Sequence, residues 1–361
     1  MSELYPSLHI LGSRQFGGAD QFFVRLVQAL YGAGQPVTAV TRPGSPVADA
    51  LDGSGIEQLN LPMANGWDLW SAWRIRQWVG RTRPAVVQTY MGRATRLTRL
   101  PRRTPAIHIA RLGGYYKIDG YYRHAHAWIG NTRGICDYLV TGGLPSERVF
   151  YIGNFVPEPV AFSPEELAAQ RRSWEIPDDH WVLLALGRLI EAKGFDDLLQ
   201  ALARLPAEIG GRPWVALIAG DGPEAEPLRN LARELGLEGR LRWLGWQNPA
   251  DRCYAVADAF VCPSRREPLG NVILEAWNYR LPVVSTRGPG PSELIEPEVN
   301  GLFCEPRDVA GMAAQIENLL LAPAARREAM GAAGHAYLNA HFSRAAILNA
   351  YLELYGRLIG S

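Results

Sequence analysis

Short apolar runs alternate with helical patterns along almost the whole chain. In the first half, runs that are apolar at nearly every position predict strands, and apolar positions about three or four residues apart predict helices. The predicted strands cover residues 8–13, 36–41, 84–90, 105–111, 126–132 and 148–154. The predicted helices cover residues 20–33 and 68–82, and a third ends at Thr141.

The alternation is interrupted once and then resumes. Residues 156–166 (VPEPVAFSPEE) contain three prolines and are interpreted as a linker. Beyond it, the pattern predicts strands at 181–189, 214–222, 241–246, 259–264 and 281–286. Helices are predicted at 194–206, 224–236, 249–257 and 270–279, and an amphipathic helix at 343–359.

The pattern predicts an α/β fold with two domains. Strands that are apolar at nearly every position are typical of parallel sheets covered by helices on both faces. With 361 residues, the chain is too long for one ordinary core. We therefore expect two doubly wound, Rossmann-like domains facing a central cleft, with ligands at the carboxyl ends of the strands. The expected bounds are 1–158 and 172–342, with 343–361 as a separate terminal helix.

Charge is balanced over the chain but is locally uneven. The net charge is +1, yet residues 67–133 hold thirteen Lys and Arg against two acidic residues, a local charge of +11. This predicts a basic face. We find no nucleic-acid recognition motif, so nucleic acid is not expected as a partner.

Compartment and membrane topology follow from what the sequence lacks. The four cysteines are widely spaced without a CxxC pair, which favours a reducing compartment over disulfides or zinc. The N-terminus lacks the features of a signal peptide, and no run of about 18 apolar residues exists.

The segment 67–83 (WDLWSAWRIRQWVGRTR) mixes tryptophan with arginine. Such a mixture suits a membrane interface with anionic headgroups. The alternative, slightly favoured for the tryptophans, is that they pack onto the sheet while the arginines stay in water. For the whole basic window, a lipid-linked or phosphorylated acceptor is favoured over plain solvated charge. The window also includes Arg93, Arg96, Arg99, Arg102, Arg103 and Lys117.

Three motifs follow predicted strands. Gly17 and Gly18 in FGGAD would let the backbone approach an anion at a helix N-terminus, although an ordinary strand–helix turn explains them equally well. In LGRLIEAKG, Arg188 and Lys193 suit a diphosphate, and solvated surface charges are the alternative. GDGPE at 220–224 is mainly a structural turn.

PSRREPLGNVILEAW (263–277) holds two glutamates eight residues apart. Glu267 is expected in a loop at the carboxyl end of a strand, where it could accept hydrogen bonds from a ligand held over the next helix N-terminus. Glu275 lies deeper in that helix and could bind a diol such as a ribose. The alternative is one capping acid and one acid on a helix face.

These motifs, in this order and spacing, resemble retaining GT-B glycosyltransferases of family GT4. GGAD, GRLIEAKG, GDGPE, LGW and EPLGNVILEAW all match, and 263–277 matches the E-x7-E motif of that family. RVFYIGNFVP (148–157) resembles a further family segment, with Asn154 in place and Phe155 where glycine is usual.

The resemblance implies transfer of a sugar, with retention, from a nucleotide diphosphate donor. It implies that Arg188 and Lys193 hold the diphosphate, that Glu267 binds sugar hydroxyls and that Glu275 binds the ribose. It also implies donor contacts from Gly17, Gly18, Leu244, Gly245, Leu269, Gly270, Asn271 and Val272. No metal or other cofactor is implied, because cations stabilise the leaving diphosphate. In the resembled fold, the last helix crosses back to the N-terminal domain.

One departure concerns the acceptor side. Many family members carry a histidine where this chain has Arg111, with His108 three residues earlier. Arg111, His108 and Lys117 are therefore candidate acceptor-side residues. The segment 110–132 is most similar to bacterial transferases that build lipopolysaccharide core or other surface glycans.

These observations together predict a cytoplasmic transferase on the inner face of the membrane. The expected partners are a nucleotide-sugar donor (UDP-sugar favoured, GDP-sugar possible), a lipid-linked or lipopolysaccharide-core glycan acceptor and an anionic membrane surface. The alternatives are a transferase with a soluble acceptor, a nucleotide-sugar epimerase of the same architecture, and a non-catalytic sugar-nucleotide-binding protein.

Overall fold

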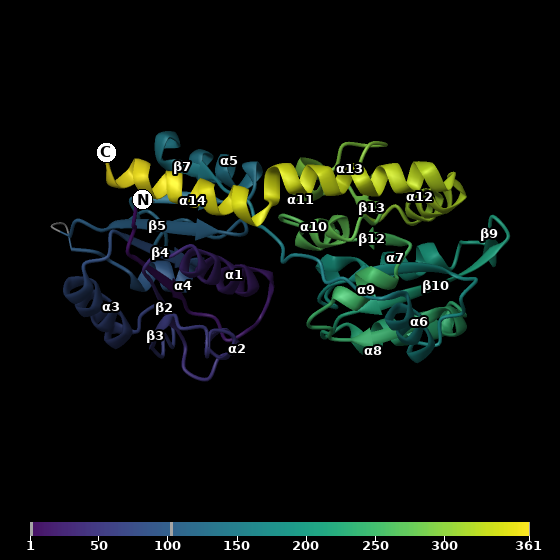
Figure 1. The fold of residues 1–361 in the computed structure, drawn as a ribbon, viewed down its shortest axis with the longest axis horizontal. Helices are drawn as coiled ribbons and strands as arrows, with labels where there is room; N and C mark the ends of the chain where they lie inside the picture. Colours follow the sequence, from purple (N-terminus) through teal and green to yellow (C-terminus); the bar gives the residue numbers. More distant parts are fainter. Residues whose placement is uncertain (1–2, 102–103, 361) are drawn as a thin grey trace. The chain divides into compact units, whose positions relative to one another are not determined.

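The computed structural model describes residues 3–101 and 104–360, which form two compact units. One unit comprises Met1–Pro157 together with Phe342–Ser361, and the other comprises Glu158–His341 (Figure 1). Each unit is an α/β unit with its own parallel sheet and its own buried core. The predicted fold class of two Rossmann-like domains is confirmed.

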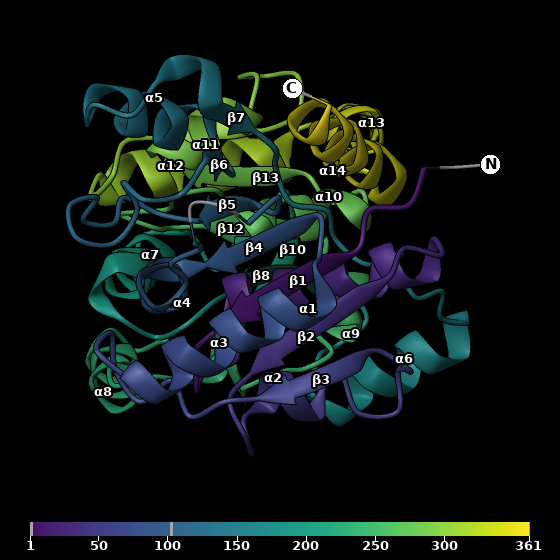
Figure 2. The same ribbon diagram turned by 90° about the vertical axis from the view of Figure 1, so that its left-hand side faces the viewer.

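The N-terminal unit is built on a parallel sheet of order β3-β2-β1-β4-β5-β6-β7, whose strands follow one another in Figure 2. Strands β1, β4 and β6 are buried at every position, as expected for a sheet covered on both faces. The strands are β1 Ser7–Leu11, β2 Val37–Thr41, β3 Glu57–Asn60, β4 Val86–Tyr90, β5 Ile107–Leu112, β6 Ala127–Gly130 and β7 Val149–Tyr151.

The helices of this unit are α1 Gly18–Gly32, α2 Pro46–Asp49, α3 Leu69–Thr82, α4 Met91–Leu97, α5 Arg133–Thr141 and α14 Arg344–Ile359. Helix α14, yellow in Figure 1, packs onto this unit through tyrosines that are fully buried. Tyr351 accepts a hydrogen bond from Arg111 at 2.8 Å, and Tyr355 donates one to Gln88 at 2.8 Å. The end of the chain is thus part of the core of the N-terminal unit.

The C-terminal unit repeats the same design. Its parallel strands run in the order β11-β10-β8-β12-β13-β14, and a short β9 pairs antiparallel with β10. The strands are β8 Trp181–Leu186, β9 Glu208–Ile209, β10 Arg212–Ala219, β11 Leu241–Gly245, β12 Ala259–Cys262, β13 Val283–Thr286 and β14 Leu302–Cys304. The helices are α6 Pro164–Ser173, α7 Phe195–Leu202, α8 Ala225–Glu234, α9 Asp251–Val256, α10 Asn271–Asn278, α11 Pro289–Leu294, α12 Val309–Leu321 and α13 Ala324–Phe342.

The predicted elements are confirmed, and two of the differences have a clear physical reason. Strand β3 was not predicted because it is a polar edge strand, EQLN, whose four positions are all partly or fully exposed. Helix α6 begins inside the predicted linker 156–166, because Ser163 caps it and Pro164 fits the first helical position.

The favoured interpretation of the tryptophans at 67–83 is wrong for three of the four. Trp67, Trp70 and Trp73 are 75, 53 and 51% exposed, whereas Trp78 packs against the core of the N-terminal unit. Arg102 and Arg103 of the basic window lie outside the described residues. Among the described residues, no helix has the length and apolar character needed to cross a membrane.

Candidate functional site

Lys193 and Glu267 meet at the carboxyl ends of two neighbouring strands. Lys193 lies in the short 3-10 helix after β8, and Glu267 lies in the loop between β12 and α10. Lys193 donates a hydrogen bond to the Glu267 carboxylate, and Ser264 donates a second one to Oε2 at 3.1 Å. The Glu267 side chain is only 9% exposed and the Lys193 side chain 23%, so the ion pair is largely shielded from water.

The pair keeps a positive charge in place. Burial acts to lower the pKa of Lys193, but the attraction and hydrogen bond of Glu267 outweigh it, and the net result is a pKa above the ordinary value. The ammonium group is therefore protonated across the neutral pH range. A fixed cation beside a carboxylate can stabilise an anion and orient hydroxyl groups at the same point.

The loop that carries Glu267 is fixed by backbone contacts. Thr286, at the end of β13, donates to the Ser264 carbonyl at 2.5 Å, and the Gly290 amide donates to the Glu267 carbonyl at 3.0 Å. Gly194 packs so closely that a Cβ there would lie 2.2 Å from the Pro263 oxygen, and its φ is +64°. Glycine is thus required for the Lys193 and Glu267 segments to approach each other.

A second ion pair joins the same two segments and was missed in the sequence. Arg265 donates to both carboxylate oxygens of Asp197 at 2.7 Å and to Asp196 at 2.5 Å. Arg265 and Asp197 are 14 and 7% exposed. The only sequence feature that could have indicated this pair is the acidic first turn of α7, which is not specific for a distant arginine.

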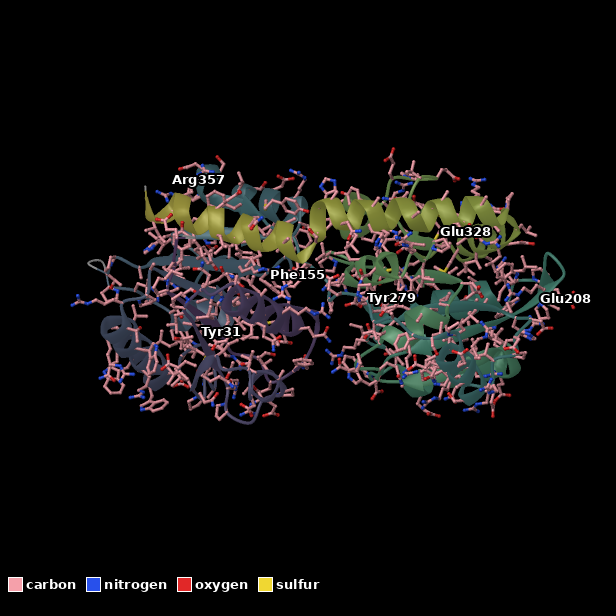
Figure 3. All side chains as sticks on the ribbon, in the orientation of Figure 1. Tyr31, Phe155, Glu208, Tyr279, Glu328 and Arg357 are labelled. Atoms are coloured by element: carbon pink, nitrogen blue, oxygen red, sulfur yellow. The ribbon has the colours of Figure 1, made fainter. Side chains whose placement is uncertain are left out.

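Glu275 lies in α10 and accepts a hydrogen bond from a tyrosine of the preceding helix. Tyr254 of α9 donates to Glu275 Oε2 at 2.9 Å and stacks on Tyr279, which is labelled in Figure 3. Burial, and then the carboxylate, raise the pKa of Tyr254, so this hydroxyl remains a donor. The sequence did not indicate Tyr254 as a partner of Glu275, because the two residues lie in separate helices.

Helix α10 begins directly after the Glu267 loop. Gly270 is its N-cap with φ +94°, a backbone conformation that suits glycine. Asn271 and Val272 form the first turn, and Leu269 is buried just before it. The amides of a first helical turn have no intrahelical partner, which makes this end able to bind an anion.

The remaining donor-side candidates lie at the carboxyl ends of strands in the same sheet. Arg188 is exposed after β8, and within the described chain no ion pair holds it. Leu244 and Gly245 end β11, where the Gly245 carbonyl accepts from the Gly220 amide at 2.8 Å. This arrangement joins the β11 end to the GDGPE turn.

In the N-terminal unit, the glycine-rich turn forms the start of α1. Gly17 is the N-cap and its amide donates to Asp20 Oδ2 at 2.8 Å, while Gly18 is the first helical residue. Burial raises the pKa of Asp20, and its Oδ1 atom has no hydrogen-bond partner in the described structure. The predicted donor contact of Gly17 and Gly18 stays a prediction.

The acceptor-side candidates differ sharply in exposure. Arg111 is buried, stacks over Phe22 at 4.1 Å and donates to Asn154 as well as to Tyr351. His108 is buried beside Thr89, and burial holds its pKa well below the usual range. Only Lys117 is exposed. The contacts of Arg111 are those of a structural residue, and an acceptor role for these residues stays a prediction.

Over residues 3–101 and 104–360, no three His, Cys, Asp or Glu side chains are grouped so that they could hold a metal ion. The expected independence of metals and cofactors stays a prediction.

Comparisons with known proteins agree with this architecture. The family described as "Glycosyl transferases group 1" matches residues 168–336, and the "Glycosyl transferase 4-like domain" family matches residues 17–154. Among solved structures, a glycosyltransferase from Rickettsia africae is similar with a TM-score of 0.87, 18% identity and 98% coverage of both chains. Anabaena HepE, solved in complex with UDP and glucose, has a TM-score of 0.83, 19% identity and coverage of 98% of this chain and 100% of its own. The GT-B fold class is thereby confirmed.

Two curated relatives match along nearly the whole chain. The lipopolysaccharide core biosynthesis glycosyltransferase LpsE of Rhizobium meliloti is 35% identical over 349 residues, covering 94% of this chain and 95% of its own. LpsD of the same organism is 34% identical with the same coverage. The chain therefore belongs to the group 1, GT4-type glycosyltransferases and is an enzyme of that family.

Proposed function

We propose that this glycosyltransferase moves a sugar, with retention, from a nucleotide diphosphate sugar to a lipid-linked or lipopolysaccharide-core glycan. The observation that carries the proposal is the ion pair of Lys193 and Glu267, largely shielded from water, at the ends of two neighbouring strands. UDP is the favoured nucleotide, which agrees with the UDP bound to HepE. Retention rests on the likeness to the family.

The proposed chemistry follows from the charges at the site. When the sugar–phosphate bond breaks, negative charge grows on the diphosphate, and the ammonium of Lys193 and the guanidinium of Arg188 stabilise it. Glu267 accepts hydrogen bonds from the donor sugar, and Glu275 accepts them from the ribose. In this scheme the two cations supply the charge stabilisation for which other enzymes use a metal.

The acceptor class is proposed from the relatives. LpsE and LpsD are named for lipopolysaccharide core biosynthesis, and this chain aligns with them nearly from end to end. A core glycan attached to lipid would place the reaction at the cytoplasmic face of a membrane. The basic window at 67–133 would then face anionic lipid or a phosphorylated acceptor.

The first prediction separates the roles of the two glutamates. Glu275→Gln should weaken the binding of UDP about tenfold to a hundredfold, the range for losing a hydrogen bond to a charged group. Glu267→Gln should not weaken UDP binding, since UDP lacks the sugar and the change removes a negative charge beside Lys193. It should, however, lower the rate of transfer strongly. Calorimetry with UDP and a transfer assay measure the two effects.

The control is Glu234→Gln on the exposed side of α8, which should change neither quantity. Loss of UDP affinity in Glu267→Gln with full affinity in Glu275→Gln would reverse the assigned roles. Conversion of the donor sugar in the absence of any acceptor would replace the transferase by the epimerase alternative.

A further inference from the structure

Helix α3 and the residues before it present bulky apolar side chains to solvent. Trp67, Leu69, Trp70 and Trp73 are 75, 81, 53 and 51% exposed, and we refer to these four as the tryptophan surface. Exposed single apolar residues are common, but three indoles and a leucine within seven residues form a patch that water solvates poorly. Such a patch is typical of an interaction surface.

The tryptophan surface is separate from the side of α3 that holds the helix in the fold. Ser71, Ile75 and Val79 recur at helical spacing and are the buried residues of α3. Leu69 and Trp73 are four residues apart, so they share the opposite side. The helix is therefore apolar on two sides, and packing within the N-terminal unit accounts for only one of them.

The charges within helix α3 are of one sign. The one acidic residue between Trp67 and Trp73 is Asp68, the N-cap of the helix, whose carboxylate accepts hydrogen bonds from the Ala64 and Ser71 amides. Residues 69–82 contain Arg74, Arg76 and Arg81 and no acidic residue. Arg76 and Arg81 are exposed, and no ion pair to either occurs within residues 3–101 and 104–360. Arg74 lies 5.8 Å from the centre of the Trp70 ring, and Arg96 lies 3.6 Å from that of Trp67. Each of these two indoles thus has a guanidinium beside it.

We propose that the tryptophan surface inserts into the headgroup region of an anionic lipid bilayer, with the surrounding arginines contacting lipid phosphates. Indole rings prefer the membrane interface, where the apolar ring and the polar N–H are both accommodated. Guanidinium groups bind phosphates, and a basic helix with an aromatic side lies flat in the interface. The inference rests on the proposed function at one point: a lipid-linked acceptor requires the enzyme to work at a membrane.

The charge distribution favours lipid over other occupants. A soluble glycan would use the indoles but would not need a helix free of acidic residues. A second copy of the chain would have to bring an acidic surface against these arginines. A bilayer rich in phosphatidylglycerol supplies both the apolar phase and the negative charge.

The experiment measures binding of the full chain to vesicles by co-sedimentation. Phosphatidylcholine vesicles with and without phosphatidylglycerol are compared at 0.1 M and 1 M salt. Wild-type protein should bind the anionic vesicles at low salt, and high salt should weaken that binding because it shortens the range of electrostatic attraction from about 10 Å to about 3 Å.

Two double variants test the two components. Trp70→Gln with Trp73→Gln should lower vesicle affinity about tenfold or more at both salt concentrations, since the loss is apolar. Arg76→Gln with Arg81→Gln should lower it about fivefold per arginine at low salt and much less at high salt. The matched control is Leu321→Gln, because Leu321 is 55% exposed in the C-terminal unit and lies outside the tryptophan surface.

The same preparations are tested for UDP binding by calorimetry. UDP affinity should be equal in wild type, the two double variants and the control. Equal affinity shows that the variants are folded. The vesicle-binding result then does not depend on whether the proposed sugar transfer is correct. The proposal is overturned if wild-type protein does not bind anionic vesicles or if the tryptophan variant binds them as well as wild type does. It is also overturned if the tryptophan change leaves vesicle binding intact and abolishes self-association in sedimentation velocity, or leaves vesicle binding intact and abolishes binding to a soluble glycan.

Discussion

At the scale of single residues, the ion pair of Lys193 and Glu267 combines a structural and a chemical role. A lysine in a shielded position ordinarily loses its charge more easily, yet Glu267 raises the pKa of Lys193 above its usual value. The same proximity makes each partner depend on the other for stability, because a shielded charge without a counter-ion is costly. Activity and stability should therefore respond differently when the partners are removed singly and together.

Lys193→Met should lower turnover about tenfold to a thousandfold, the range for losing one electrostatic stabiliser. It should also destabilise the C-terminal unit by about 1–2 kcal/mol, because Glu267 would remain as a shielded and unpaired carboxylate. Adding Glu267→Gln should restore the stability but not the turnover. Urea unfolding and a transfer assay with the three proteins check this. If the double variant were no more stable than Lys193→Met, the ion pair would have no structural role.

At the scale of elements, the loop between β12 and α10 is fixed by a contact between residues that lie far apart in the sequence. Arg265, after β12, binds Asp196 and Asp197 in the first turn of α7, 69 and 68 residues away in sequence. Lys193 lies just before α7, and Glu267 lies two residues after Arg265. The Arg265 contact therefore sets the distance between the segments that carry the ion pair.

Arg265→Lys should lower the rate of transfer about tenfold while UDP affinity changes little, because lysine keeps the charge but cannot bind both aspartates in the planar geometry of arginine. A displacement of the catalytic groups of about 1 Å is enough for losses of this order or more. Steady-state kinetics and calorimetry with UDP measure the two effects. The neighbouring Arg266→Lys is the control, since Arg266 is exposed. Equal losses in both variants would mean that the Arg265 contact does not position the site.

The elements also show what the sequence can and cannot predict. Strand β12 and helix α10 were predicted within a few residues of their bounds, because a buried strand and an amphipathic helix need continuous or periodic apolar positions. Strand β3 escaped prediction because an edge strand of a parallel sheet can be polar. Neither Arg265 nor Tyr254 was predicted, because their partners lie in other elements and local spacing does not encode such contacts.

At the scale of the whole molecule, Rossmann-like topology brings distant residues to the carboxyl ends of neighbouring strands. This rule predicted that Arg188, Lys193 and Glu267 lie at one edge of one sheet, and the strand order places them there. The rule gives no information on side-chain orientation. Arg111 ends β5 in the same manner, yet its guanidinium turns inward to Tyr351 of the last helix.

The core of the N-terminal unit also holds buried histidines that should make its stability depend on pH. His9 in β1 is fully buried, with Nδ1 hydrogen-bonded to the Tyr90 hydroxyl at 2.9 Å and Nε2 to the Ser7 hydroxyl at 3.1 Å. Burial lowers the pKa of His9 to about 3 from the usual 6.5. The unfolded chain therefore binds a proton below pH 6.5 that the folded chain excludes until about pH 3. The stability is fully present above pH 6.5 and falls as the pH drops through this window.

We expect His9 alone to lower the free energy of unfolding by about 2 kcal/mol between pH 6.5 and pH 5, since each pH unit contributes about 1.4 kcal/mol in this window. His9→Gln cannot gain this proton, so its stability should fall less steeply over the same interval, whatever its stability at neutral pH. His341→Gln, an exposed position, controls for the loss of an imidazole. Urea unfolding at pH 7, 6 and 5 measures the slopes. If His9→Gln and wild type lost stability equally as the pH fell, His9 would not be the group that causes the acid sensitivity. The sensitivity would then come from His108 and its neighbours His124 and His126, whose pKa values are also lowered by burial.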